Sequence, residues 1–99
     1  MGKKGYWIAL IDVTDPERYK AYVAVVGGIL AKYHGRFLVR GGTSKLVEGT
    51  ARARIVMIEF PDYATATECY FSPEYTAAKA LRNSASEGDV MIVEGFEPA

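Results

Sequence analysis

Two helix-start signals divide this chain of 99 residues. Each consists of a side chain that can cap a helix, followed by proline and then glutamate, and they stand at residues 15–17 (DPE) and 72–74 (SPE). The capping oxygen accepts a backbone N–H, the φ angle of proline suits the first turn, and glutamate favours the positive end of the helix dipole. We therefore expect a helix to begin at each signal.

The first helix has an apolar stripe on one face and ends at a glycine. Gly35, which follows His34, supplies a left-handed stop. Gly27 and Gly28 lie in the middle, where each costs about 1 kcal/mol relative to alanine. They mark either a weak point or a place where another backbone comes close. The apolar positions repeat at helical spacing: Tyr19, Tyr22, Val23, Val26, Ile29, Leu30 and Tyr33.

Four segments rich in β-branched and aromatic residues are expected to be strands. We expect the second strand to continue raggedly toward Val47 and to form a hairpin with the third strand around a turn at Gly49. Asp62 then caps a short helix, so the second helical region is broken in two. The expected strands are Tyr6–Val13, Arg36–Arg40, Arg54–Phe60 and Gly88–Phe96.

The order of these elements is β-α-β-β-α-β, which predicts a single α+β domain spanning residues 1–99. Right-handed crossovers favour a ferredoxin-like, four-stranded antiparallel sheet with the helices on one face. The first, third and fourth strands are apolar at nearly every position, so the second face of the sheet must also be covered. A second copy of the chain is the simplest cover, and we expect a homodimer through the sheet face, a dimeric α+β barrel with a small cavity between the sheets.

Composition excludes several function classes. Lys plus Arg and Asp plus Glu each number 12, so no overall charge would recruit nucleic acid or anionic lipid. The apolar runs are well short of the roughly 20 residues that span a bilayer, and no signal peptide opens the chain. Cys69 is the single cysteine and cannot close an intramolecular disulfide. These features favour a cytoplasmic protein without membrane or nucleic-acid partners.

Five segments of the chain resemble the bacterial domain-of-unknown-function family 1330. They read GYWIALIDVTDPERYKAY, KYHGRFLVRGG, IVMIEFPDY, CYFSPEYTAAKALR and GDVMIVEGF, and together they cover almost the whole chain. The resemblance implies membership of the dimeric α+β barrel superfamily, which includes antibiotic-biosynthesis monooxygenases, haem-degrading enzymes and muconolactone isomerases. The family itself has no established activity. This chain departs from the family pattern at His34-Gly35, where Gly-Gly is expected.

Glu59 is a carboxylate within an otherwise apolar strand, where an unpaired charge is costly. In a hairpin that turns near Gly49, Arg40 falls within about one position of being opposite Glu59, and opposed residues share a face. We expect the two to pair. The pair is either a structural ion pair or a working pair, in which Arg40 clamps an anionic substrate and Glu59 moves a proton. An edge or rim position for Glu59 is the third reading.

His34 is the only side chain that titrates near neutrality without help, and haem-using relatives would need an axial ligand. Its place before Gly35 also suits a role at the negative end of the helix. With no second histidine and no partner for Cys69, we expect no metal site. A dinucleotide would need a phosphate-binding loop that the sequence lacks, so we also expect no cofactor and a colourless protein.

Aromatic residues offer walls for a ligand. Trp7 and Tyr75 are the aromatic residues that we select as ligand-binding candidates, beside Arg40 and Glu59, although most of the tyrosines suit a core position. Residues 36–54 contain five basic residues, arginine or lysine. Beyond Arg82 all charged residues are acidic. This asymmetry could dock two subunits, guide an anion to the barrel, or form a solvated face.

Two functions from different classes follow from these observations. The first is a homodimer that binds a small anionic or aromatic metabolite in the barrel cavity, with cofactor-free monooxygenase-like or isomerase-like activity as its chemistry. The second is a non-enzymatic dimerisation or ligand-sensing module. The sequence contains no GxSxG, P-loop or GxGxxG motif, which argues against serine hydrolases, NTPases and Rossmann dehydrogenases.

Overall fold

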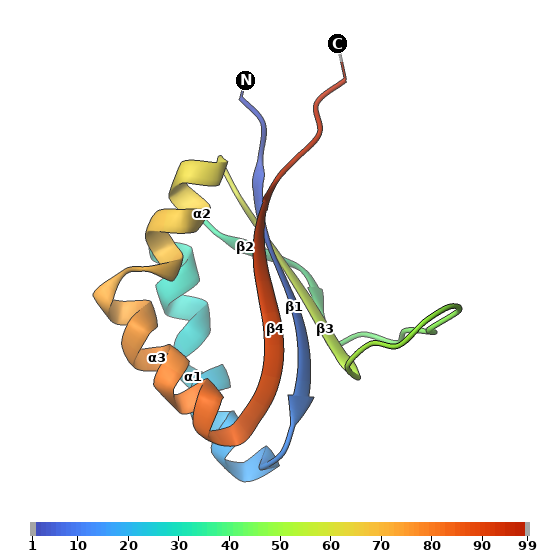
Figure 1. The fold of residues 1–99 in the computed structure, drawn as a ribbon. Coiled ribbons are helices and arrows are strands. Elements are labelled where there is room, and N and C mark those ends of the chain that lie inside the picture. Colours follow the sequence, from blue (N-terminus) through green and yellow to red (C-terminus); the bar gives the residue numbers. More distant parts are fainter. Residues whose placement is uncertain (1, 99) are drawn as a thin grey trace.

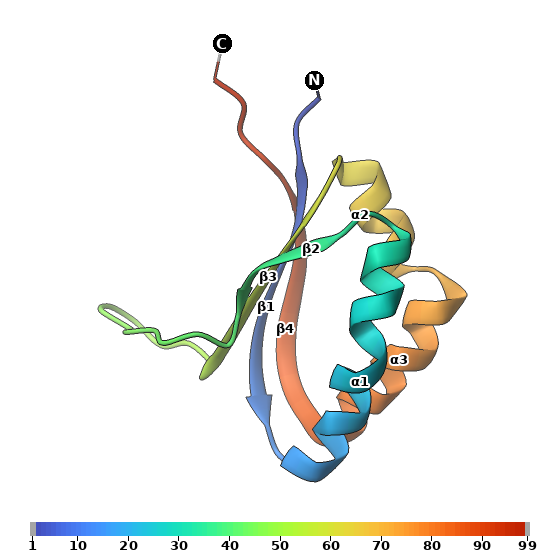
Figure 2. The same ribbon diagram turned by 180° about the vertical axis from the view of Figure 1, so that it is seen from behind.

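The computed structural model describes residues 2–98. Four strands form one antiparallel sheet in the order β2-β3-β1-β4, and the helices lie against one face of it (Figure 1, Figure 2). This arrangement confirms the ferredoxin-like α+β fold and the broken second helical region. The elements are β1 (Gly5–Val13), α1 (Pro16–Lys32), β2 (Arg36–Arg40), β3 (Arg54–Phe60), α2 (Tyr63–Tyr70), α3 (Pro73–Ala85) and β4 (Ser86–Glu94).

The helices begin where the capping residues predict. Asp15, Asp62 and Ser72 each accept the backbone N–H of the residue three positions later, at 3.2, 2.7 and 3.2 Å. Proline follows Asp15 and Ser72 at the first helical position. Each cap satisfies a backbone donor that the helix itself leaves free, so the sequence fixes these boundaries locally.

The two faces of the sheet differ in burial. Trp7 and Ile11 of β1 face the helices and are buried, at 2% and 1% exposure. Ile8 alternates with them and therefore lies on the opposite face, between Met57 of β3 and Met91 of β4. No helix of the described residues covers that face (Figure 1). We call it the open sheet face, and its apolar residues are Ile8, Leu10, Ile55, Met57, Met91 and Val93.

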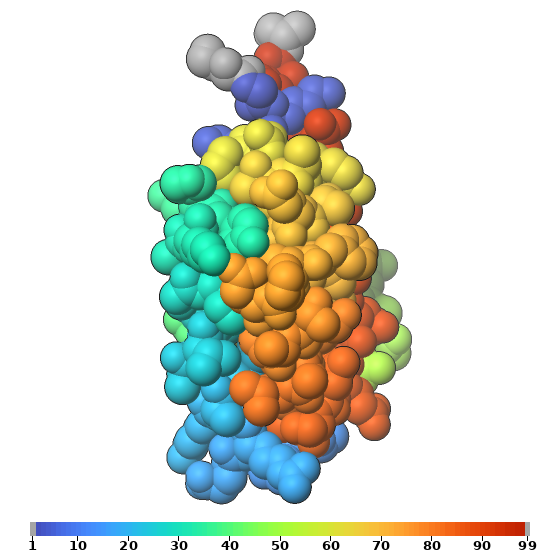
Figure 3. Space-filling view, turned by 90° about the vertical axis from the view of Figure 1, so that its left-hand side faces the viewer, coloured from blue at the N-terminus to red at the C-terminus, as the bar shows by residue number. Residues whose placement is uncertain are grey.

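The helix layer is continuous. Figure 3 shows α1 beside α3, with α2 above α3 at the upper end of the layer, and an ion pair between Lys32 and Glu74 joins α1 to α3. The hydrogen bond from the Lys32 ammonium lowers the pKa of the Glu74 carboxyl. Within residues 2–98, none of the helices is both long and apolar enough to cross a bilayer. The core beneath the layer includes Trp7, Ile11, Val26, Leu30, Ile58, Phe60, Ala66, Cys69, Tyr75 and Ala78.

The expected extension of the second strand toward Val47 is wrong. β2 ends at Arg40, and residues 41–53 form a loop that projects away from the sheet (Figure 1, Figure 2). We call this loop the β2–β3 arm. Leu46 and Val47 on the arm are exposed. At its base, Arg52 pairs with Asp12 at 2.9 Å, with Asp89 at 3.1 Å and with Glu87 at 3.7 Å. The basic segment of residues 36–54 and the acidic segment beyond Arg82 therefore contact each other within a single chain.

The end of α1 differs from the expectation in one residue. His34, not Gly35, adopts the left-handed conformation, with φ at 63°. Histidine tolerates this region better than most residues. Gly35 is needed for another reason, because a Cβ there would lie 2.7 Å from the ring of Phe60. The fourth strand is also shifted by two residues and runs from Ser86 to Glu94.

Two glycines of this region should respond oppositely to alanine. Around Gly28 nothing lies within 4 Å of an added Cβ, so Gly28→Ala should raise the free energy of unfolding by about 0.5–1 kcal/mol. Gly35→Ala should lower it by about 1–3 kcal/mol, because the buried ring of Phe60 cannot yield. Urea midpoints measure both. Equal effects of one sign would contradict the assignment of Gly28 as the weak point.

Candidate functional site

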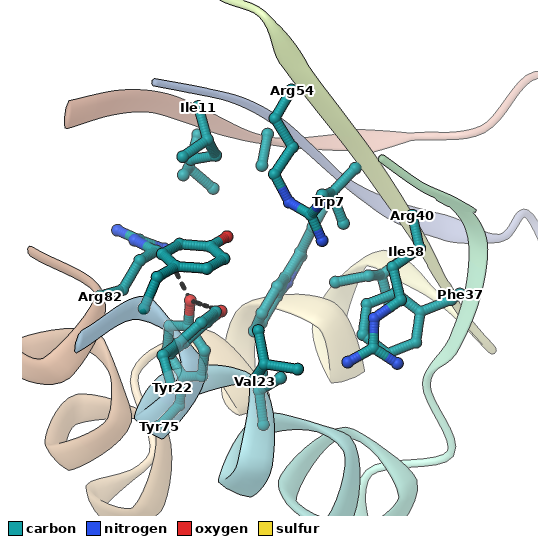
Figure 4. A pocket seen from close by; sticks show the side chains of 15 residues that line it. Trp7, Ile11, Tyr22, Val23, Phe37, Arg40, Arg54, Ile58, Tyr75 and Arg82 are labelled. Carbon is teal, nitrogen blue, oxygen red and sulfur yellow. Dashed lines mark hydrogen bonds between the residues drawn. The ribbon is translucent and has the colours of Figure 1, made fainter. Parts of the chain in front are cut away.

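A narrow pocket lies between the helix-covered face of the sheet and the helices α1 and α3 (Figure 4). The cavity volume is about 30 Å³. This space is far too small for a polyketide, so a ligand that enters it must be small. The pocket is lined by Trp7, Ala9, Ile11, Tyr19, Tyr22, Val23, Val26, Phe37, Arg40, Arg54, Val56, Ile58, Tyr75, Arg82 and Val90.

Three arginines contribute guanidinium groups to this pocket: Arg40 from β2, Arg54 from β3 and Arg82 from α3. No aspartate or glutamate lines it. Within residues 2–98, no carboxylate oxygen lies within 4.0 Å of any of these three side chains, although most other arginines are paired in this way. The pocket therefore concentrates positive charge without a counter-ion from the described chain.

Arg54 differs from the other two in having a buried donor without a partner among the described residues. This donor is its Nε. The guanidinium lies against the backbone of Gly41 at the base of the β2–β3 arm, where a Cβ would approach Arg54 Nη1 to 2.2 Å. Arg40 is exposed, with its guanidinium 4.0 Å above the ring of Phe37. A buried unpaired donor is costly, so Arg54 points to an absent acceptor.

A hydrogen-bonded pair of tyrosines forms another wall. The hydroxyl oxygens of Tyr22 and Tyr75 lie 2.8 Å apart, and Arg82 Nη1 donates to the Tyr75 hydroxyl at 2.6 Å (Figure 4). Burial raises the pKa of both phenols above the ordinary value. Both hydroxyls therefore keep their protons at neutral pH. The ring of Trp7 packs 4.8 Å from that of Tyr75 and closes the pocket on the side of the sheet.

The expected pair of Arg40 and Glu59 does not form. Glu59 is opposite Arg36 in the sheet, and Arg36 Nε donates to its carboxylate at 2.9 Å. The Tyr6 hydroxyl also donates to Glu59, at 3.4 Å. A bulge between Phe37 and Val39 shifts the register, so Arg40 lies opposite Val56 and lines the helix-side pocket. Glu59 lies on the open sheet face and lines no part of this pocket.

Of the residues predicted to bind a ligand, Trp7, Arg40 and Tyr75 line the same pocket. The predicted catalytic candidates do not, because His34 is exposed beyond the end of α1 and Glu59 lies on the other face. Cys69 is buried, and burial raises the pKa of its thiol to about 12. No group of three or more histidine, cysteine or acidic side chains within residues 2–98 could hold a metal ion.

Sequence reasoning missed Arg54, Arg82 and the tyrosines of α1 as pocket residues. The helical spacing of Tyr75, Ala78 and Arg82 was a usable signal, because it places Arg82 on the buried face of α3, where the structure finds it. Leu81 lies outside this stripe and is exposed. Side chains alternate between the two faces of a strand, and Arg54 is an even number of residues from Ile58 and Phe60 along β3. Arg54 therefore lies on the same, helix-covered side of the sheet as these two buried residues.

Comparison with known proteins gives a family and a fold. The sequence model described as "Domain of unknown function (DUF1330)" matches residues 4–96. No curated protein matches the chain. A protein of unknown function from Rhodopseudomonas palustris has a similar structure, with a TM-score of 0.77 at 17% identity; the alignment covers 99% of this chain and 86% of that one.

Two further solved structures have the same fold at low identity. SnoaB, a cofactor-independent oxygenase from Streptomyces nogalater, aligns with a TM-score of 0.66 at 11% identity over 97% of this chain and 96% of its own. A dimeric ferredoxin-like protein of unknown function from Jannaschia sp. CCS1 aligns with a TM-score of 0.67 at 13% identity over 95% and 99%. At such identities the likeness concerns the fold alone.

Proposed function

This chain belongs to the DUF1330 family, and from that premise we propose that it is a homodimer that binds a small anionic ligand in the pocket between its sheet and its helices. The observation that carries this proposal is the set of three guanidinium groups around a pocket without a carboxylate. The single, buried Cys69 is consistent with a reducing compartment, and we propose the cytoplasm.

The dimer is inferred from the open sheet face. Its residues are apolar, and Met91 and Val93 of its edge strand β4 are 44% and 39% exposed in the single chain. Monomeric proteins rarely expose contiguous apolar patches larger than a few hundred square ångströms. A structural neighbour is described as a dimeric ferredoxin-like protein. A second copy, packed face to face, would cover both patches with one isologous contact.

The ligand is inferred from Arg54, whose buried donor has no partner among the described residues, and from Arg40, which lines the same pocket. A guanidinium group offers five N–H donors and no acceptor, and it binds carboxylates in a planar, two-pronged geometry. The buried Nε of Arg54 lacks such a partner in the described chain. The apolar walls formed by Val56 and Ile58 exclude water and strengthen the attraction between a guanidinium and an anion.

The pocket supports ligand binding better than acid–base catalysis, because no general base of the described chain lines it. A general base must be unprotonated at the working pH. No histidine, cysteine, lysine or carboxylate of the described chain lines the pocket, and the two hydrogen-bonded phenols, Tyr22 and Tyr75, have raised pKa values. A metabolite-binding or sensing role therefore has more support than isomerase-like chemistry. Oxygenase turnover is the second candidate, because the fold is similar to that of a cofactor-independent oxygenase.

The test compares an anion with a neutral molecule of the same shape. In calorimetric titration, benzoate should bind the wild-type protein and benzamide should not. Arg54→Met should weaken benzoate binding by about tenfold or more, the effect of losing a charge-assisted hydrogen bond. Lys45→Met, on the β2–β3 arm outside the pocket, is the matched control. Equal binding of the two probes, or no benzoate binding at millimolar concentration, would contradict the proposal.

A further inference from the structure

The polar groups of the pocket have more hydrogen-bond donors than the chain can satisfy. The three arginines can only donate. The tyrosine pair adds one more free donor. Between Tyr22 and Tyr75 there are two hydroxyl hydrogens, and a single hydrogen bond joins them. The Tyr75 oxygen also accepts from Arg82. Whichever hydroxyl donates within the pair, the hydrogen of the other has no acceptor among the described residues.

These donors form two separate ends of one pocket. In Figure 4 the guanidinium of Arg54 extends from β3 into the pocket, and the hydroxyl groups of Tyr22 and Tyr75 lie on the opposite side of the pocket. Dashed lines join these two hydroxyls to each other and Tyr75 to Arg82. The walls of the pocket are otherwise aromatic and aliphatic, and they include the ring of Trp7. Arg82 is 9% exposed and contributes positive charge close to the hydroxyl end.

We infer that the ligand is a small planar anion with two acceptor groups: a carboxylate for Arg54 and Arg40, and a second oxygen, that of a carbonyl, hydroxyl or oxyanion, for the hydroxyl pair of Tyr22 and Tyr75. This inference rests on the proposed function and adds the requirement for a second acceptor. Oxo acids and hydroxyaryl acids have this chemistry. An anion with one polar end would leave the free hydroxyl donor and the charge of Arg82 without a partner, and a site of this kind rejects ligands that lack the second group.

Two matched pairs of probes test the second acceptor by calorimetry. Pyruvate is compared with methacrylate, in which a CH2 group replaces the keto oxygen, and 4-hydroxybenzoate is compared with 4-fluorobenzoate. Each pair keeps the planar shape and the carboxylate and differs in the acceptor. The wild-type protein should prefer the acceptor-bearing member of at least one pair by about tenfold. The double variant Tyr22→Phe with Tyr75→Phe should lose that preference and still bind the carboxylate. Tyr33→Phe, whose hydroxyl donates to Glu74 outside the pocket, should keep it.

The outcomes separate this inference from the proposed function. If benzoate binds but neither pair is discriminated by the wild-type protein, the second acceptor is wrong and anion binding stands. If the preference survives in the double variant, the tyrosine pair does not recognise the acceptor and the inference also fails. If no carboxylate binds, the proposed function itself is wrong. The comparison within the wild-type protein needs no variant, so a folding defect cannot hide the result.

Discussion

Met57→Glu is expected to abolish the dimer. Met57 lies at the centre of the open sheet face, directly opposite Ile8 in the sheet. In a face-to-face dimer each copy would bury one new carboxylate without a partner, and two-fold symmetry doubles the cost. A dimer with micromolar affinity is held by about 8 kcal/mol, and each 1.4 kcal/mol lost raises the dissociation constant about tenfold. Two unpaired buried carboxylates exceed what such an interface tolerates.

Sedimentation at micromolar concentration measures this effect. The wild-type protein should have twice the chain mass of 10.9 kDa, and Met57→Glu should have that of a single chain. Val25→Glu, on the exposed side of α1, is the matched control and should stay dimeric. Far-UV circular dichroism then distinguishes a folded monomer from an unfolded chain; both mean loss of the dimer. A monomeric wild-type protein, or a dimeric Met57→Glu, would contradict the barrel arrangement.

The helices could be predicted from sequence because their signals are local. A capping side chain at Asp15, Asp62 or Ser72 acts on a backbone N–H only three residues away. Nothing elsewhere in the chain has to be known for this effect. The same holds for the stripe of α3, where spacing alone places Tyr75 and Arg82 on one face.

The register between β2 and β3 could not be predicted in the same way. A hairpin register follows from the length and type of its turn. Here the two strands are separated by the arm of residues 41–53, so counting outward from a turn at Gly49 does not give the pairing. The bulge after Phe37 adds a further shift of one residue. A one-residue shift moves a side chain to the opposite face, which is why Arg40 and Glu59 lie on different sides of the sheet.

Only part of the candidate site could be predicted from the sequence, and the reason again concerns the faces of the sheet. Both faces of β3 are largely apolar, so the sequence could not indicate which of its charged residues, Arg54 or Glu59, faces the helices. Glu59 drew attention because a carboxylate among apolar residues needs a partner, and it has one in Arg36. Arg54 resembled a surface charge in sequence. Its buried and unpaired Nε became apparent only once α1, β2 and the arm were folded around it.

Trp7→Ala is expected to remove much of the stability of the protein. The indole ring lies 5.1 Å from Phe60 and 4.8 Å from Tyr75, and its Nε1 donates to the backbone carbonyl of Ala66 at 2.8 Å. Truncation of a buried tryptophan costs about 3–5 kcal/mol. The loss includes the hydrogen bond from Nε1 to the Ala66 carbonyl, and such a bond contributes about 0.5–1.5 kcal/mol. Domains of this size are stable by only about 5–15 kcal/mol.

The measurement is a urea titration followed by far-UV circular dichroism, since Trp7 is the only tryptophan and its fluorescence is lost with it. All proteins must be compared at one chain concentration, because the stability of a dimer depends on concentration. Phe96→Ala, which truncates an aromatic side chain that is 89% exposed, should change the free energy of unfolding by less than about 0.5 kcal/mol. If Trp7→Ala costs less than about 1 kcal/mol, Trp7 is not the rigid wall of the pocket that its packing against Phe60 and Tyr75 indicates.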